Sequence, residues 1–231
     1  MLHISNFIKN IITDIYVPEK FGINLDDDWS DNFDAFVSDI ENNYAGAEVC
    51  HGVSKAVIVA KDEDIVVKVP FQGYYESYEE NEEDFDEQFG VFYPNEGANN
   101  KFNNWDYCQL EVEEYEKAKA HHVGNFFAEV QKVEHGCYIQ EKCECFCVKN
   151  SGVARSENSM NASNRLRKKY HVRFNSLFIA DCVEYYGEEA TDNFLAYVYE
   201  YGIDEDMHDS NYGYATADGR PVLIDYSGWW D

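Results

Sequence analysis

The spacing of apolar residues changes along the chain, and it separates predicted strands from predicted helices. Between residues 49 and 71, short runs of β-branched residues are interrupted at Gly52 and at the polar segment 61–64, which predicts three consecutive strands. The runs 125–133 and 135–143 predict two more strands. Strands joined by such short turns pair in antiparallel fashion, so we expect an antiparallel sheet.

Other segments repeat their apolar residues at helical spacing, with about 3.6 residues per turn. Gly187 and Gly202 directly follow two of them, and glycine is the residue that most often follows a helix C-terminus. Residues 151–163 are rich in serine and asparagine and predict a mobile loop. Strands followed by helices indicate an α+β fold. The predicted helices cover residues 2–14, 28–44, 105–120, 174–186 and 188–201.

The C-terminal segment brings three oxygen-bearing side chains to a predicted hairpin. Asp206 precedes Asn211 by five residues, a strand begins at Tyr212, a turn covers 217–220, and the returning strand ends at Asp225. Carboxylate and amide oxygens, together with phosphate, are the ligands that Mg²⁺ prefers. The segment therefore predicts a metal and phosphate site, although Asp and Asn also favour ordinary turns.

This arrangement resembles the catalytic and metal-binding loops of the protein-kinase-like superfamily. The order Asp206-Met-His-Asp-Ser-Asn211 is closer to aminoglycoside and other small-molecule phosphotransferases than to protein kinases. Asp225-Tyr-Ser-Gly228 stands where kinases have Asp-Phe-Gly. The resemblance implies that Asn211 and Asp225 hold Mg²⁺ and that Asp206 orients or deprotonates the acceptor hydroxyl.

The resemblance continues upstream with a strand lysine and a helix glutamate. Lys68 stands among β-branched residues, as in the Val-Ala-Ile-Lys strand of kinases, which implies contact with the α- and β-phosphates of ATP. Glu111 on the predicted helix 105–120 would hold that lysine, and Glu114 on a neighbouring stripe is the alternative. The other interpretation of Lys68 is a solvent-facing lysine on an edge strand.

The resemblance also implies a nucleotide loop and a hinge. Gly52 is the single glycine at the place where protein kinases have three. Ser54 and Lys55 follow it, and we expect them to add a hydroxyl group and a positive charge to the phosphate contacts. Glu141 and Cys143 lie in the segment that takes the place of the hinge, where the protein backbone would bind the adenine base.

The resemblance covers about residues 46–228 and implies a two-lobed protein-kinase-like fold, with an antiparallel N-lobe sheet and a reduced helical C-lobe. The chain ends three residues after Gly228, and we expect no activation segment, which argues against ordinary phosphorylation of protein substrates. The predicted parts are an N-terminal helical extension (1–45), an N-lobe (46–148) with an acidic insertion at about 72–104, and a minimal C-lobe (149–231).

Net charge is the most extreme bulk property of the chain. With 45 acidic and 18 basic residues, the formal charge is −27. Phosphate backbones repel such a protein, so we expect no direct binding of nucleic acid, and bound ATP would need Mg²⁺ and local cations. The charge favours solubility, but it also suits a surface that mimics nucleic acid or docks a basic partner protein. Residues 76–87 concentrate it and predict a solvated loop.

The basic residues gather between positions 149 and 173, which hold seven of the 18. One interpretation is that they pair with acidic groups of the same chain. The other is that they recruit phosphate or an anionic substrate. The seven residues are Lys149, Arg155, Arg165, Arg167, Lys168, Lys169 and Arg173.

Seven cysteines, an odd number, and the lack of a signal-peptide pattern predict a cytoplasmic protein with reduced thiols. No stretch reaches about 18 apolar residues, so we expect no membrane span. Cys143, Cys145 and Cys147 alternate with other residues and would share one face of a strand. Zinc sites usually combine two cysteine pairs and no second pair follows here, so we expect thiols without a metal.

Three classes of function fit these observations. The first is an ATP-dependent phosphotransferase, or a nucleotide transferase, acting on an unknown acceptor. The second is a catalytically silent pseudokinase that binds nucleotide and acts through partners. The third is an acidic interaction protein, for example a viral one directed at a basic or nucleic-acid-binding host protein. A compact, acidic, kinase-like chain also looks like bacteriophage and bacterial reading frames.

Overall fold

The computed structural model describes residues 2–15, 29–51, 55–70, 72–74, 89–91, 107–134, 136–149, 155–204 and 207–226. The chain forms two compact units. The N-terminal unit comprises Met1–Val112 and Val130–Gln140, and the C-terminal unit comprises Glu113–Glu129 and Glu141–Asp231. The predicted N-lobe, 46–148, therefore contributes residues to both units.

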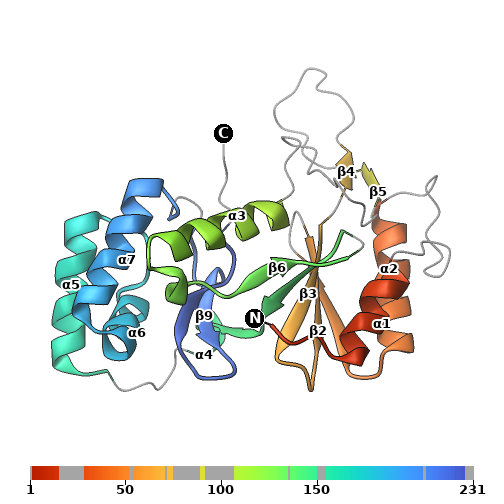
Figure 1. The fold of residues 1–231 in the computed structure, drawn as a ribbon, viewed down its shortest axis with the longest axis horizontal. Helices are drawn as coiled ribbons and strands as arrows, with labels where there is room; N and C mark the ends of the chain where they lie inside the picture. Colours follow the sequence, from red (N-terminus) through yellow and green to blue (C-terminus); the bar gives the residue numbers. More distant parts are fainter. Residues whose placement is uncertain are drawn as a thin grey trace. The chain divides into compact units, whose positions relative to one another are not determined.

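A five-stranded sheet with the order β1-β2-β3-β7-β6 forms the centre of the N-terminal unit (Figure 1). The pairs β1–β2, β2–β3 and β6–β7 are antiparallel, as expected from the short connections. The five strands that the apolar runs predicted are thus present, with different bounds. They are β1 (Ala47–His51), β2 (Lys55–Ala60), β3 (Ile65–Pro70), β6 (Val130–Lys132) and β7 (Tyr138–Glu141).

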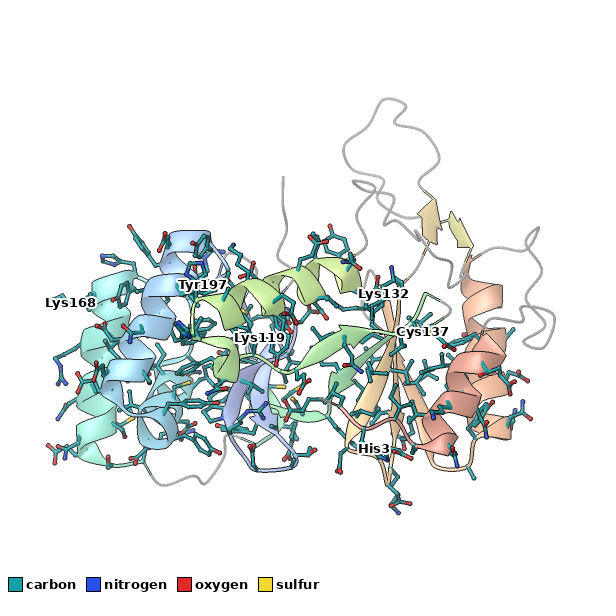
Figure 2. All side chains as sticks on the ribbon, viewed as in Figure 1. His3, Lys119, Lys132, Cys137, Lys168 and Tyr197 are labelled. Atoms are coloured by element: carbon teal, nitrogen blue, oxygen red, sulfur yellow. The ribbon has the colours of Figure 1, made fainter. Side chains whose placement is uncertain are left out.

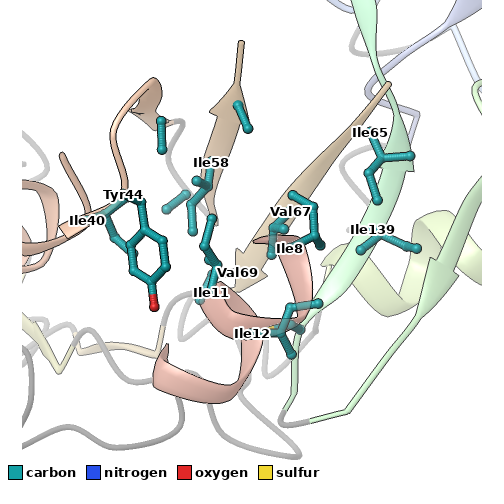
Figure 3. Packing of buried hydrophobic residues seen from close by; sticks show 14 of the residues in the cluster. Ile8, Ile11, Ile12, Ile40, Tyr44, Ile58, Ile65, Val67, Val69 and Ile139 are labelled. Carbon is teal, nitrogen blue, oxygen red and sulfur yellow. The ribbon is translucent and has the colours of Figure 1, made fainter. Parts of the chain in front are cut away.

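Two helices, α1 (Asn6–Ile15) and α2 (Trp29–Asn43), cover one face of this sheet (Figures 1 and 3). Side chains alternate between the two faces of a strand, so every second residue of β2 and β3 enters the core beneath the helices. These residues are Ala56, Ile58 and Ala60 from β2 and Ile65, Val67 and Val69 from β3. They pack against Ile8, Ile11, Ile12, Phe36 and Ile40 from the helices.

The other face of the sheet receives the first part of α3 (Tyr107–Ala120). The hydroxyl group of Tyr138 in β7 donates a hydrogen bond to Gln109 Oε1 of this helix, at 3.4 Å. With helices on both faces, β3 is buried along its whole length, which explains why its sequence is almost uniformly apolar. The N-terminal unit also contains a two-stranded sheet of β4 (Gln72–Tyr74) and β5 (Phe89–Val91).

Three longer helices belong to the C-terminal unit: α5 (Glu157–Tyr170), α6 (Ser176–Tyr186) and α7 (Glu188–Tyr201). The predicted ends at Gly187 and Gly202 are confirmed. The predicted loop over 151–163 is wrong from residue 157 onward. The Ser156 side chain accepts a hydrogen bond from the Ser159 amide, so this serine caps α5, and the Ser/Asn-rich composition marks a helix start.

A small antiparallel sheet, with the order β10-β9-β8, completes the C-terminal unit. Its strands are β8 (Cys143–Cys145), β9 (Tyr212–Ala215) and β10 (Pro221–Leu223), and β9 and β10 form the predicted hairpin. The strand expected to carry all three alternating cysteines ends at Cys145. Cys147 instead lies in the short helix α4 (Phe146–Lys149), so the three thiols do not share a strand face. A short 3₁₀ helix covers Gly124–Phe126.

Glycine is required at one position of this sheet. A Cβ atom on Gly213 would lie 2.1 Å from the backbone oxygen of Glu144 in the adjacent strand. Only glycine permits this close pairing of β8 with β9. In the part of the chain that the structure describes, no helix is both long and apolar enough to cross a membrane.

Candidate functional site

Lys68 and Glu111 form a buried ion pair in the N-terminal unit. The Nζ atom of Lys68 donates to Glu111 Oε2 at 2.6 Å, and the two side chains are 3% and 0% exposed. The predicted contact between the strand lysine and the helix glutamate is confirmed. The alternative of an exposed edge-strand lysine is wrong, because β3 is flanked by β2 and β7.

A second lysine reaches the same carboxylate. Lys55 Nζ donates to Glu111 Oε1 at 2.5 Å, and the Lys55 side chain is 6% exposed. The strand register explains this convergence. Val57 faces Lys68 across the β2–β3 pair, and Lys55 lies two positions from Val57, so both lysines point to the sheet face opposite the α1–α2 core. One glutamate on α3 therefore anchors two lysines from adjacent strands.

The partners of the two α3 glutamates show that Glu111, and not Glu114, makes these contacts. Both glutamates are buried, at 0% and 8% exposure, and they lie three residues apart on the helix. Within the C-terminal unit, Glu114 Oε1 accepts a hydrogen bond from the Tyr197 hydroxyl at 2.5 Å, and Glu114 Oε2 lies 3.3 Å from Lys117 Nζ. Glu114 thus has a separate set of partners, and the alternative assignment fails.

Asn211 and Asp225 are held together by backbone hydrogen bonds in the C-terminal unit. The carbonyl oxygen of Asn211 accepts the amide of Ile224 at 2.7 Å and the amide of Asp225 at 3.1 Å. Asn211 directly precedes β9 and Asp225 follows β10, so the hairpin brings together two residues that are 14 positions apart in the sequence. The predicted hairpin therefore brings the backbones of Asn211 and Asp225 close together, as expected.

These two residues offer a carboxylate and an amide oxygen, which are hard ligands suited to Mg²⁺. A Mg²⁺ site commonly takes one or two protein oxygens and completes its shell with water and phosphate. Among the residues described, no three His, Cys, Asp or Glu side chains gather as a metal cluster would require. Magnesium binding by Asn211 and Asp225 stays a prediction.

The loop before Asn211 is braced by hydrogen bonds, and among the residues involved sequence reasoning did not single out Tyr212, Asp209 and Asn175. The Tyr212 hydroxyl donates to Asp209 and accepts from the Asn175 amide at 3.2 Å. Burial first, and then the Asp209 carboxylate, raise the pKa of Tyr212 above its usual value, so the hydroxyl keeps its proton. The Ser210 amide donates to His208 Nδ1 at 3.3 Å, and the His208 carbonyl accepts from the Asn211 amide at 2.8 Å. The spacing of Asp209 and Tyr212, three residues apart, was the only available signal for this hydrogen bond, and the same spacing is common in hairpins.

Three of the predicted site residues lie outside the described residues. They are Asp206, the expected positioning base, and Gly52 and Ser54 of the expected nucleotide loop. Their roles stay predictions.

Glu141, expected at the hinge, makes contacts within the C-terminal unit. Its carboxylate accepts from Arg220 Nη1 at 2.6 Å and from Arg220 Nη2 at 2.5 Å. Burial raises the pKa of Glu141 above its usual value, and the nearby Arg220 opposes this shift. The Glu141 amide donates to the Glu129 carbonyl at 2.8 Å, and the Cys143 thiol donates to the Glu141 carbonyl at 3.4 Å. The structure thus gives this segment a bracing function, and adenine binding here stays a prediction.

Three of the basic residues between 149 and 173 have acidic partners within the C-terminal unit. Arg155 binds Asp181 through two nitrogens, each at 2.7 Å from a carboxylate oxygen, and Tyr214 donates to the same aspartate at 2.6 Å. Arg165 and Lys169 pair with acidic residues of α7 at 2.7 and 2.8 Å. The interpretation of intramolecular pairing holds for these three, while Lys168 is exposed on α5 (Figure 2).

Comparison of the chain with protein-family models, with curated proteins and with solved structures gives no match.

Proposed function

We propose that this chain is a kinase-like protein that binds ATP with Mg²⁺ and transfers a phosphoryl or nucleotidyl group to an acceptor. One observation carries the proposal, namely the buried contact of Lys68 in β3 with Glu111 in α3. In kinases the corresponding lysine contacts the phosphates of ATP, and the corresponding glutamate holds that lysine in place.

Burial makes this pair informative. Removing a lysine and a glutamate from water costs several kcal/mol per ion, so a buried ion pair is weak support for stability compared with apolar residues of similar size. A chain that keeps charged groups at such a position gains something other than stability. A lysine held at a fixed position by a glutamate is a preorganised cation for phosphate oxygens.

The order of the elements supports the same conclusion. The strand that carries Lys68 is followed by the helix that carries Glu111, then by two more strands of the same sheet, and later by a hairpin flanked by Asn211 and Asp225. This order agrees with the parts of a kinase: strand lysine, helix glutamate, hinge and metal loop.

Each residue has a definite role in the proposal. Lys68 contacts the phosphates and Glu111 positions it, while Asn211 and Asp225 hold the metal. Asp206 orients the acceptor hydroxyl or removes its proton, which is worth about 10²–10⁴-fold in rate. When bound, Mg²⁺ neutralises charge on the phosphate oxygens.

The test is thermal unfolding with ATP, with and without Mg²⁺, for wild type, Lys68→Met and Asp225→Asn. ATP at 100 times its dissociation constant stabilises a protein by about 2.7 kcal/mol, which for a chain of this size is a shift of about 5–11 °C. We expect a Mg²⁺-dependent shift in wild type and its loss in both variants. Two control variants, Lys119→Met and Asp218→Asn, change exposed residues and should respond like wild type.

A second measurement separates transfer from binding. Wild type is incubated with ATP labelled on either the γ- or the α-phosphate and with a panel of hydroxyl-bearing small molecules and proteins. Labelled acceptor or labelled protein that disappears in Asp225→Asn supports the proposal. If ATP and Mg²⁺ do not change the melting temperature of wild type, the proposed function is overturned. If the melting temperature shifts but no labelled group is transferred, the transferase part is overturned and the chain is a nucleotide-binding pseudokinase.

A further inference from the structure

We propose that Lys55 is a second phosphate-binding lysine, and that Lys55, Lys68 and Glu111 form a two-lysine site for adjacent phosphate groups of a nucleoside triphosphate. The inference rests on the proposed nucleotide binding and adds a residue and a ligand preference to it. The sequence suggested only that Lys55 adds charge near the phosphates, whereas the structure places its ammonium group on the same carboxylate as that of Lys68.

The two ammonium groups contact the same carboxylate. They donate to the two oxygens of one carboxylate, at 2.5 and 2.6 Å, so only the width of that carboxylate separates their acceptors. Lys55 and Lys68 are diagonal neighbours on one sheet face, a spacing of about 7–8 Å between their backbones that long side chains bridge easily. Glu111 belongs to a helix and is fully buried, so the carboxylate that both lysines contact is held in place.

The charges favour an anion with several negative groups. Two ammonium groups lie on one carboxylate at a buried position, in a chain whose total charge is −27. Interactions between charges are stronger in a buried site than in water, so two ammonium groups at this point would attract phosphate despite the overall repulsion. An ammonium has three N–H donors, and each lysine uses one on Glu111 in these contacts.

A second buried lysine is hard to explain by stability alone. Each buried ion adds a desolvation cost, so placing two lysines on the Glu111 carboxylate is not the arrangement that stability alone favours. Lys55 is the first residue of β2 and follows directly on the segment that contains Gly52 and Ser54. Sequence reasoning expected Gly52 and Ser54 to contact the phosphates, so a cation at this point of the sequence suits the same ligand.

The inference predicts a preference for the longer phosphate chain. Hydrogen bonds to charged groups contribute about 1.5–3 kcal/mol, so loss of one lysine should weaken binding about 10- to 100-fold. We expect Lys55→Met and Lys68→Met each to weaken Mg²⁺–ATP and inorganic tripolyphosphate by that factor, while adenosine binding changes less than about twofold. Lys55→Arg keeps the charge and should retain ATP binding within a few-fold.

Isothermal titration calorimetry of wild type and these variants, with Lys119→Met as the exposed control, measures the constants. Wild type that binds none of the ligands overturns the proposed function. Wild type that binds ATP, with Lys68→Met weakened and Lys55→Met equal to wild type, overturns only the role of Lys55. Unfolding curves without ligand establish that each variant is folded.

A labelling experiment on wild type needs no variant. An acyl phosphate of ATP transfers its acyl group to a nearby amine: Nζ attacks the acyl carbon, an amide forms, ATP leaves and the amine loses its proton to solvent. Peptide mass spectrometry should find the acyl group on both Lys55 and Lys68, and an excess of ATP should prevent both modifications. Modification of Lys68 alone contradicts the two-lysine site.

Discussion

Replacing Glu111 by glutamine tests how much the charge of this carboxylate stabilises the two buried lysines. The substitution keeps the shape of the side chain and removes its charge. Lys55 and Lys68 then lose the carboxylate that they contact at 2.5 and 2.6 Å, and two ammonium groups stay buried beside a neutral amide.

The structure sets the size of the expected effect. Glu111 is 0% exposed and the two lysine side chains are 6% and 3% exposed. Removing one partner of a buried ion pair destabilises a protein by about 3–5 kcal/mol. For a chain of 231 residues, about 2–4 °C per kcal/mol gives a fall of roughly 6–20 °C in melting temperature.

Glu116→Gln is the matched control, because it makes the same chemical change on the same helix. Glu116 is 60% exposed and pairs with Lys119 three residues later at 2.8 Å. Exposed pairs of this type contribute about 0.2–0.5 kcal/mol, so the control should melt within roughly 2 °C of wild type. Circular dichroism during heating and in urea measures both variants.

A triple variant, Lys55→Met with Lys68→Met and Glu111→Leu, should not show the fall in melting temperature expected for Glu111→Gln. Apolar replacement of a whole buried charged group is often neutral or stabilising, by about 1–4 kcal/mol, so the triple variant should melt near or above wild type. It should bind no ATP. If Glu111→Gln is as stable as Glu116→Gln, the argument about buried charge is refuted.

Further predictions concern the C-terminal unit and the thiols. Gly213→Ala should disrupt the pairing of β8 with β9, because the new Cβ would lie 2.1 Å from the Glu144 oxygen, and urea unfolding should show a clear loss of stability. Asp181→Leu leaves a buried arginine without its carboxylate and should cost about 3–5 kcal/mol in the same assay, whereas an unchanged midpoint would contradict the burial argument. Burial raises the pKa of Cys137 to about 12, so only about one molecule in 10⁴ carries the thiolate at pH 8, and iodoacetamide should modify exposed Cys50 long before Cys137.

Much of the fold followed from local patterns. The β-branched runs predicted three strands, the runs 125–133 and 135–143 predicted two more, and Gly187 and Gly202 predicted two helix ends, because these signals depend on neighbouring residues. The contact between Lys68 and Glu111 was expected from the resemblance to kinases, because an exposed edge-strand lysine was an equally local interpretation of the sequence. The start of α5 was missed because serine favours both loops and helix caps.

Contacts that depend on register or on distant segments were not predictable. Lys55 meets Glu111 only because β2 and β3 pair with Val57 opposite Lys68, and the intervening turn sets that register. The Arg220–Glu141 pair joins residues 79 positions apart, and no local pattern connects them. Sequence reasoning therefore did not foresee that the Glu141 carboxylate binds an arginine of the hairpin turn, while adenine binding by the backbone of this segment stays a prediction.

The strand order has a consequence for how the protein is made. β7 lies between β3 and β6, although it is the last of the five strands in the sequence. During synthesis, β1, β2 and β3 can pair as soon as they emerge, but β3 then keeps an apolar, unpaired edge until residue 141 is available. Only β7 covers that edge, so a pause of the ribosome between residues 71 and 137 would prolong the most aggregation-prone stage of folding.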